Sequence, residues 1–244
     1  MVNVFSFCIY GPETLKYYHG LLENIRLINQ HYADWKIYVY AGDDVTEGFL
    51  ATLRANPSVV LNQTGLHGTP NTVHRFFAID DPDVDVAFFR DADSRVHWKD
   101  RWAINDFLAS GRAVHIIRDH KDHGSCIPAG LWGVRKGVFA TTLRQAFQDW
   151  TPIHAGNGRP DDPASFGIDQ NFLGRVIYPS IRPLALVHYS NGQLFREEGG
   201  KEFPFVWSED VFCGKVELGV GSQPDPRPPP LPFRVGALNF LPKR

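Results

Sequence analysis

Two aspartates separated by one residue, Asp91 and Asp93, follow an apolar run in the segment VAFFRDAD. In an extended backbone, residues two apart point to the same side, so both carboxylates can face one cation. Carboxylate oxygens are hard ligands that suit Mg²⁺ or Mn²⁺, and such an ion offsets the charge of a bound diphosphate. The pair therefore predicts a divalent metal site. The alternative is a solvated turn in which one aspartate caps the next element.

Histidines offer further ligands. His188 lies in LVHYSN, at the predicted end of an apolar strand, and an imidazole beside two carboxylates suits Mn²⁺. The alternative for His188 is a strand-end histidine bonded to a backbone carbonyl. A second group, His115, His120 and His123, lies in HIIRDHKDHG. Its spacing matches no helical zinc pattern, which favours a substrate-facing loop over a zinc site.

Strands and helices alternate along the part of the chain that must position these residues. Apolar, β-branched runs predict strands, and apolar residues at helical spacing predict helices. The expected strands cover 2–10, 35–40, 58–61, 84–89, 113–117, 127–134 and 184–188, and the expected helices cover 13–31, 45–55, 71–79, 99–110, 138–150 and 166–178. This order predicts an α/β protein with a mainly parallel sheet. Ligands bind outside the carboxyl ends of such strands, where Asp91 and Asp93 are expected.

Composition limits the classes of function. The 244 residues are 43% hydrophobic and 21% charged, with a net charge of −2, so a soluble globular protein is expected and a nucleic-acid binder is not. Three scattered cysteines predict no disulfide framework and favour a reducing, cytoplasmic location. The first residues do not resemble a signal peptide, and no apolar run approaches the ~18 residues of a membrane span.

The last part of the chain is unlike the rest. The segment SQPDPRPPPLPF, at 222–233, can continue neither a helix nor a strand ladder. We therefore expect one catalytic domain over 1–221 and a proline-rich tail over 222–244. A polyproline-like wrap or linker is the favoured interpretation of the tail, and an SH3-type ligand is the alternative. The Gly-, Asn-, Pro- and Asp-rich stretch 151–163 is a long loop of the kind that is often functional.

Four features occur in the order found in nucleotide-sugar-dependent glycosyltransferases of the GT-A fold, and the chain resembles that family over 2–191. They are the strand, Gly-Pro and helix of FCIYGPETL, the arginine-containing helix NTVHRFFAID, the DxD segment FFRDADSR, and the later blocks CIPAGLWGVRKG, FGIDQNFLGRV and LVHYSN. The later blocks are similar to the acceptor strand, the Asp-Gln helix and the metal-binding His of glycogenin-like retaining enzymes. The chain also resembles small DxD glycosyltransferases of large DNA viruses and bacterial glycan clusters.

The resemblance implies a GT-A-like sheet, mostly parallel and flanked by helices, and a metal-dependent site. In that site Asp91 would contact the donor ribose and the metal, and Asp93 would bind the metal directly. His188 would complete the protein ligands of Mn²⁺ or Mg²⁺. Asp169 and Gln170 would face the reacting centre as the catalytic pair.

The resemblance also implies residues that bind the nucleotide-sugar donor. Tyr10 and Gly11 would line the base pocket, and Arg75 would meet the nucleotide or the donor sugar. The alternative for Arg75 is a salt bridge on a helix surface. Asp119 would hold donor hydroxyls. Gly130, lacking a side chain, would let the sugar approach the backbone closely.

The chain departs from the glycogenin-like pattern after His188. Gly192 follows that histidine by four residues instead of three, and no Lys-Pro-Trp occurs. A lysine for the diphosphate is therefore unassigned, with Lys201 and Lys215 as candidates.

The implied activity is transfer of a sugar from a nucleoside-diphosphate sugar, with UDP favoured as the nucleotide, to an acceptor hydroxyl of a glycan. The IDQN and VHYSN blocks favour retention of configuration. A haloacid-dehalogenase-like phosphatase is one alternative, since its DxD also follows an apolar strand. That class places DxD on its first strand, however, whereas three strands precede it here. A non-catalytic sugar-binding module is the other alternative, and the intact DxD argues against it.

Overall fold

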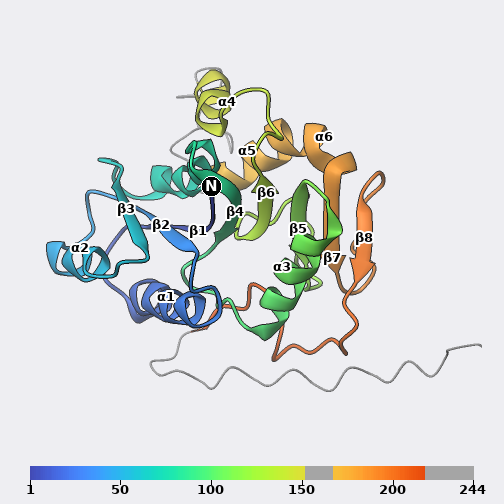
Figure 1. Cartoon of the computed structure of the whole chain (residues 1–244), viewed down its shortest axis with the longest axis horizontal. Coiled ribbons are helices and arrows are strands. Elements are labelled where there is room, and N and C mark those ends of the chain that lie inside the picture. The colour runs from blue at the N-terminus through green and yellow to red at the C-terminus, as the bar shows by residue number, and fades with distance from the viewer. Residues whose placement is uncertain (152–166, 218–244) are drawn as a thin grey trace, which may run out of the picture.

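An eight-stranded sheet forms the centre of the molecule, and helices cover both of its faces (Figure 1). The structure, a computed structural model, describes residues 1–151 and 167–217. Its strand order is β3-β2-β1-β4-β6-β5-β7-β8, and β6 alone runs antiparallel to its neighbours. The strands are β1 (Val2–Ile9), β2 (Lys36–Ala41), β3 (Val59–Gln63), β4 (Val84–Arg90), β5 (Val114–Arg118), β6 (Leu131–Arg135), β7 (Ala185–Tyr189) and β8 (Gly199–Glu202). The predicted α/β class and mainly parallel sheet are confirmed.

The helices divide between the two faces of the sheet. In Figure 1, α1 (Gly20–His31), α2 (Glu47–Arg54) and α3 (Trp98–Ser110) lie below the sheet. On the other side lie α4 (Leu143–Trp150), α5 (Ile168–Phe172) and α6 (Tyr178–Ile181). The shorter helical elements are η1 (Leu15–His19), η2 (Thr69–Asp80), η4 (Leu173–Ile177) and η5 (Arg182–Leu184).

Strand alternation places one of the two larger hydrophobic clusters on each face of the sheet, and a smaller third cluster lies around Trp98 and Phe205. Successive strand side chains point to opposite faces of a sheet. Val4 of β1 and Phe89 of β4 therefore pack toward η2 and α5, whereas Phe5 and Phe88 pack toward α1 and α3. This alternation decides which strand-end residues can reach the same site.

The structure corrects several predicted elements. The helix expected over 13–31 begins with the π-helical η1, capped by Thr14, and becomes α-helical at Gly20. The helix expected over 71–79 is the 3₁₀ helix η2. The one expected over 138–150 starts only at Leu143, because the Thr142 side chain caps it there. The stretch expected to be one helix over 166–178 divides into α5, η4 and α6.

Two further findings concern the ends of the described chain. Strand β8, of sequence GGKE, was not predicted, because it has no apolar alternation and is half-buried or exposed throughout. The tail 222–244, and all but the first residue of the predicted loop 151–163, lie outside the described residues. Within 1–151 and 167–217, none of the helices has the length and apolar character to cross a membrane.

Candidate functional site

A cleft of about 570 Å³ opens at the carboxyl ends of the central strands. Its walls come from the end of β1, from η1 and η2, from the turn after β4, from the loop before β6 and from the start of α5. The sheet changes from parallel to antiparallel pairing between β4 and β6. Ten site residues are predicted from the sequence, and seven of the nine other than Gly11 line this cleft.

 The seven that line the cleft are Tyr10, Arg75, Asp91, Asp93, Gly130, Asp169 and Gln170, and the two that do not are Asp119 and His188.

The two aspartates of the DxD segment lie in a turn. Strand β4 ends at Arg90, and the Ser94 N–H and hydroxyl both donate to the Asp91 carbonyl, at 3.4 and 3.2 Å. The expected extended geometry is therefore absent, yet both residues line the cleft. The Asp91 side chain is 46% exposed, whereas that of Asp93 is 12% exposed. The protein atoms around Asp91 reduce its solvation and raise its pKa, the charge of Arg75 opposes this effect, and the neighbouring Asp93 adds to it.

Arg75 joins two parts of the site. This buried residue of η2 lies 2.9 Å from Asp91 Oδ1 and 2.9 Å from Asp169 Oδ2. Burial alone would lower the pKa of Arg75, but the two carboxylates outweigh it and raise that pKa. The guanidinium also donates to Cys8 Sγ, at 3.3 Å. The alternative of a salt bridge on a helix surface is thus wrong: Arg75 is a buried bridge between the β4 turn and α5.

Gly130 and Gln170 shape the wall formed by the loop before β6. A Cβ atom on Gly130 would lie 2.0 Å from Asp91 Oδ2, so only glycine leaves room for this carboxylate. The Gln170 side chain accepts from the Ala129 N–H, at 3.1 Å, and donates to the Ile127 carbonyl. Gln170 therefore lines the cleft and also holds the loop that contains Gly130.

Lys16 is a cleft-side residue that the sequence analysis missed. It lies on η1, and its Nζ is 3.0 Å from Asp93 Oδ2 and 3.1 Å from the Tyr17 hydroxyl. Hydrogen bonding to Asp93 raises the pKa of Lys16. A signal was present in the sequence, because Lys16 follows the Gly-Pro of the first strand, in the segment already assigned to nucleotide binding.

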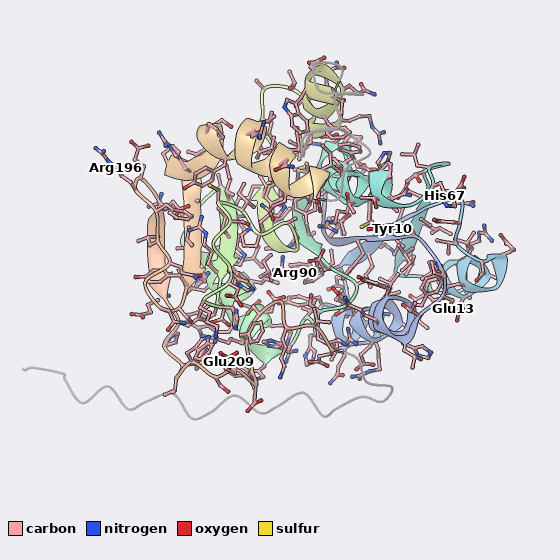
Figure 2. All side chains as sticks on the ribbon, turned by 180° about the vertical axis from the view of Figure 1, so that it is seen from behind. Tyr10, Glu13, His67, Arg90, Arg196 and Glu209 are labelled. Atoms are coloured by element: carbon pink, nitrogen blue, oxygen red, sulfur yellow. The ribbon has the colours of Figure 1, made fainter. Side chains whose placement is uncertain are left out.

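Tyr10 and Gly11 follow directly after β1, which ends at Ile9, one residue earlier than predicted. Tyr10 lines the cleft, and Figure 2 shows it in the same half of the molecule as Glu13 and His67, away from Arg196 and Glu209. Gly11 has a φ of +77°, a conformation that favours glycine. Its carbonyl accepts a hydrogen bond from the Tyr18 hydroxyl, at 2.7 Å, which fixes the turn between β1 and η1.

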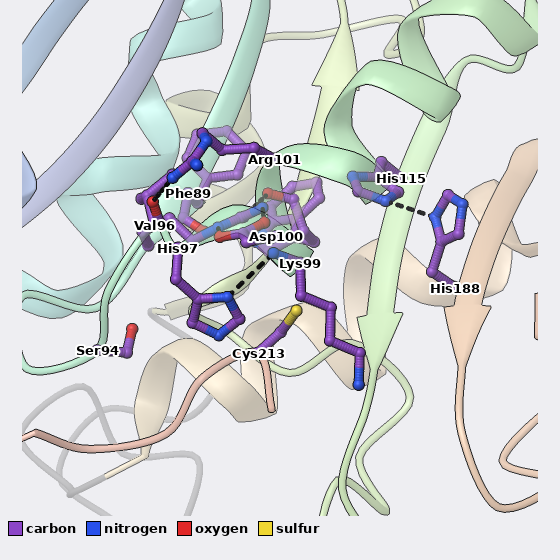
Figure 3. Close-up of polar contacts among 12 residues, drawn as sticks. Phe89, Ser94, Val96, His97, Lys99, Asp100, Arg101, His115, His188 and Cys213 are labelled. Carbon is purple, nitrogen blue, oxygen red and sulfur yellow. Dashed lines mark hydrogen bonds and ion pairs between the residues drawn. The ribbon is translucent and has the colours of Figure 1, made fainter. Parts of the chain in front are cut away.

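The structure does not bring His188 to the cleft. In β7, Val187 faces the core under η2 and α5, so His188 faces the opposite side, toward α3. Its Nδ1 is 2.9 Å from His115 Nε2 (Figure 3). Its Nε2 is 3.0 Å from Asp106 Oδ2. Both ring nitrogens are therefore engaged. The backbone-carbonyl alternative is not observed either, because the partners of His188 are side chains.

These contacts fix the tautomers of the two histidines. Asp106 can only accept, so His188 Nε2 carries the proton and His188 Nδ1 accepts from His115 Nε2–H. His115 Nδ1 is then a bare lone pair, in agreement with its burial without a hydrogen-bond partner. Burial lowers the pKa of His188 to about 4 and that of His115 well below its usual value, so both rings are neutral.

Asp119 is also away from the cleft. Its carboxylate is fully buried, with Oδ1 2.7 Å from Lys99 Nζ and 2.6 Å from the Ser190 hydroxyl. Its Oδ2 accepts from the Cys213 N–H, at 2.9 Å. Figure 3 shows the Lys99 side chain extending past Cys213. The carboxylate is saturated by these partners, so the predicted role in holding donor hydroxyls is not supported.

The histidines of the β5 loop separate in the structure. His115 is buried on β5, His120 stacks on Phe212, and His123 lines the cleft. Among the described residues, the metal-ligating side chains that gather within 4.8 Å of one another form one group of three, Asp43, Asp44 and His67. The three histidines are not that group, and nothing in their placement supports zinc.

Comparison with known proteins relates the fold to glycosyltransferases. No family model matches the chain, and no curated protein does. A glycosyltransferase involved in the glycosylation of the major capsid of PBCV-1 has a TM-score of 0.50 and 12% identity, over 78% of this chain and 82% of that one. S. aureus TarS 1-349 has a TM-score of 0.46 and 15% identity, over 70% of this chain and 54% of that one.

A third solved structure is the mannosyltransferase PcManGT from Pyrobaculum calidifontis in complex with GDP-Man and Mn²⁺. Its TM-score is 0.42 at 15% identity, over 56% of this chain and 45% of that one. The chain thus spans about half the length of TarS 1-349 and of PcManGT. At these identities the similarity concerns the fold: an α/β protein with a mostly parallel sheet flanked by helices.

Proposed function

We propose that this protein is a metal-dependent glycosyltransferase. It would transfer a sugar from a nucleoside-diphosphate sugar, with a UDP-sugar favoured, to an acceptor hydroxyl of a glycan. The observation that carries the proposal is the position of Asp91 and Asp93 in one cleft, with Arg75 connecting Asp91 to Asp169. The fold shared with glycosyltransferases supports it.

The residues present fit a divalent cation. Asp91 Oδ1 is held by Arg75, whereas Oδ2 lies outside that ion pair and faces Gly130. Asp93 adds a second carboxylate at the same cleft. Two carboxylates suit Mg²⁺ or Mn²⁺, which keep other positions for water and phosphate oxygens. When bound, the ion would supply Lewis-acid stabilisation of the leaving diphosphate.

The chain itself would hold and orient the two substrates. The end of β1, with Tyr10, would form one wall of the nucleotide site, as the sequence pattern suggests. Asp169 would hold a hydroxyl of the donor or acceptor, kept in place by Arg75 at 2.9 Å. Positioning of this kind accounts for a large part of the catalysis of group transfer.

Retention of configuration is the outcome that we favour. Asp169 is engaged by Arg75, and Gln170 by the loop before β6, so both are placed to position groups more than to accept a proton. The bond from the sugar carbon to the diphosphate oxygen breaks and a bond to the acceptor oxygen forms. The acceptor proton passes to the departing phosphate, so no protein base is needed.

The phosphatase alternative is less well supported. It requires Asp91 as a free nucleophile after the first strand, whereas Asp91 follows β4 and is paired with Arg75. The sugar-binding alternative predicts glycan binding that does not depend on a metal ion.

Calorimetric titration with UDP- and GDP-sugars, with and without Mn²⁺, tests the proposal. We expect binding that requires both components and that falls at least tenfold in Asp93→Ala, because a direct ligand is lost. His67→Ala is the matched control, since His67 belongs to the other group of ligating side chains. Incubation with the bound donor and glycan acceptors should then release the nucleoside diphosphate. The proposal fails if UDP-, GDP-, TDP- and CDP-sugars all leave the protein unbound in the presence of Mn²⁺.

A further inference from the structure

We infer that Lys16 is the diphosphate-binding lysine of this cleft, and that in the free protein it occupies Asp93 in place of the metal ion. This inference rests on the proposed function. Neither of the two lysines that the sequence suggests pairs with a cleft carboxylate. Lys201 pairs with Asp106 on the α3 side of the sheet. Lys215 follows the cleft residue Gly214, but its Nζ donates to the Asp210 carbonyl, at 2.8 Å.

The balance of charge in the cleft is the first argument. Three carboxylates line it, those of Asp91, Asp93 and Asp169. Arg75 neutralises part of this charge through Asp91 and Asp169, and it is buried and fixed. Asp93 instead pairs with Lys16, whose Nζ lies 3.0 Å from Asp93 Oδ2. Lys16 is therefore the ammonium group already located at the predicted metal position.

The partial exposure of the Lys16 side chain is the second argument. It is 33% exposed and extends from η1 over the Tyr17 ring, 4.7 Å from the ring centroid. A lysine has a flexible four-carbon stem and three donors, so it can exchange one anion for another at small cost. Arg75, by contrast, is buried between two carboxylates and has no such freedom.

Competition for one carboxylate then couples the two ligands. A divalent cation on Asp93 repels the Lys16 ammonium. A metal ion that arrives without nucleotide must therefore displace Lys16 from Asp93, and its affinity is weak. A diphosphate that arrives with the metal offers Lys16 a new anion of higher charge. Nucleotide therefore assists metal binding, and by reciprocity metal assists nucleotide binding.

The test compares Lys16→Met with wild-type Lys16 in a common His67→Ala background, which removes the imidazole ligand of the Asp43, Asp44 and His67 group. Mn²⁺ alone is titrated by the electron paramagnetic resonance signal of the free ion, and UDP is titrated calorimetrically with Mn²⁺ present. We expect Lys16→Met to bind Mn²⁺ alone more tightly and UDP about tenfold more weakly, as loss of a hydrogen bond between charged groups implies. Affinity for uridine, which has no phosphates, should not change.

Two further variants complete the experiment. Lys201→Met removes an exposed lysine that is also paired with an aspartate, but away from the cleft, and it should change neither affinity. Lys16→Arg keeps the charge and should retain more UDP affinity than Lys16→Met.

The failures are distinguishable. If UDP does not bind to the wild type with Mn²⁺, GDP and guanosine replace UDP and uridine. If no nucleoside diphosphate binds, the proposed function fails, and this inference fails with it. If UDP binds and Lys16→Met binds UDP and Mn²⁺ as the wild type does, Lys16 has no such role, while the proposed function stands. An equal loss of UDP and uridine affinity would also overturn the inference, because it would place Lys16 at the base and not at the diphosphate.

Discussion

At the scale of single residues, the site depends on one position that has no side chain, Gly130, and on one buried arginine, Arg75. Gly130 has no side chain, and the space that a Cβ would fill belongs to Asp91 Oδ2. Asp91 in turn is oriented by Arg75, which also holds Asp169. One glycine and one arginine therefore fix the direction of the carboxylate that we assign to the metal.

This arrangement predicts the effect of Gly130→Ala. The added methyl group would lie 2.0 Å from Asp91 Oδ2, so the carboxylate must turn away. We expect UDP affinity with Mn²⁺, measured by calorimetry, to fall ten- to a hundredfold, the range found when the orientation of a metal ligand is lost.

The matched control is Gly124→Ala, in the same loop region, where a Cβ meets nothing within 4 Å. It should bind UDP as the wild type does, and both variants should unfold near the wild-type temperature. Wild-type affinity in Gly130→Ala would show that Asp91 is not held in the direction that we describe.

At the scale of elements, strand alternation explains both the successes and the failures of prediction. The order of strands and helices up to β4 follows from hydrophobic spacing, which is local information. The assignment of His188 to the metal site is wrong because it relied on the position of His188 at a strand end, without knowledge of which face of the sheet the side chain occupies. Lys16 was missed for a related reason: its ion pair with Asp93 joins residues far apart in the sequence.

The chain of groups that connects β5, β7 and α3 predicts how stability depends on pH. His188 has a pKa of about 4 in the folded protein, below its ordinary value of 6.5, because it is buried. The unfolded chain therefore binds more protons between pH 6.5 and pH 4, and stability falls as the pH is lowered through that interval. His115 acts in the same direction. For His188 alone, the loss is on the order of 3 kcal/mol.

Urea unfolding between pH 7 and pH 4 tests this prediction. His188→Asn removes the titrating ring and should flatten the decline in the free energy of unfolding, even if it lowers stability at pH 7. His67→Asn, in an exposed loop position, is the control and should leave the slope unchanged. Asp106 and Lys201, which face His188, are present in both proteins. An unchanged slope in His188→Asn would mean that His188 is not the group that resists protonation.

At the scale of the whole molecule, the cleft is a product of topology. Its walls come from segments spread from Cys8 to Gly214, which the sheet order brings to one edge. The last described residues lie beside the turn after β4. Ser94 pairs with Val216, and the Glu217 N–H donates to the Asp93 carbonyl, at 2.9 Å. Hydrophobic patterns in the sequence cannot predict such long-range contacts, because they report on residues that are neighbours in the sequence and not on residues that meet in the fold.

This convergence predicts a pattern of hydrogen exchange on ligand binding. With UDP and Mn²⁺ bound, exchange should slow in the segments that line or border the cleft, namely 8–17, 69–75, 91–95, 127–131, 167–170 and 213–217, since bound ligands suppress local opening. The edge strand β8 and helix α2, which do not line the cleft, should exchange as before and serve as internal controls. Mass-spectrometric hydrogen exchange of the wild type and of Asp93→Ala separates specific protection from general stabilisation. Protection confined to α2 and β3, in the wild type as in Asp93→Ala, would place the nucleotide outside this cleft and contradict the site as a whole.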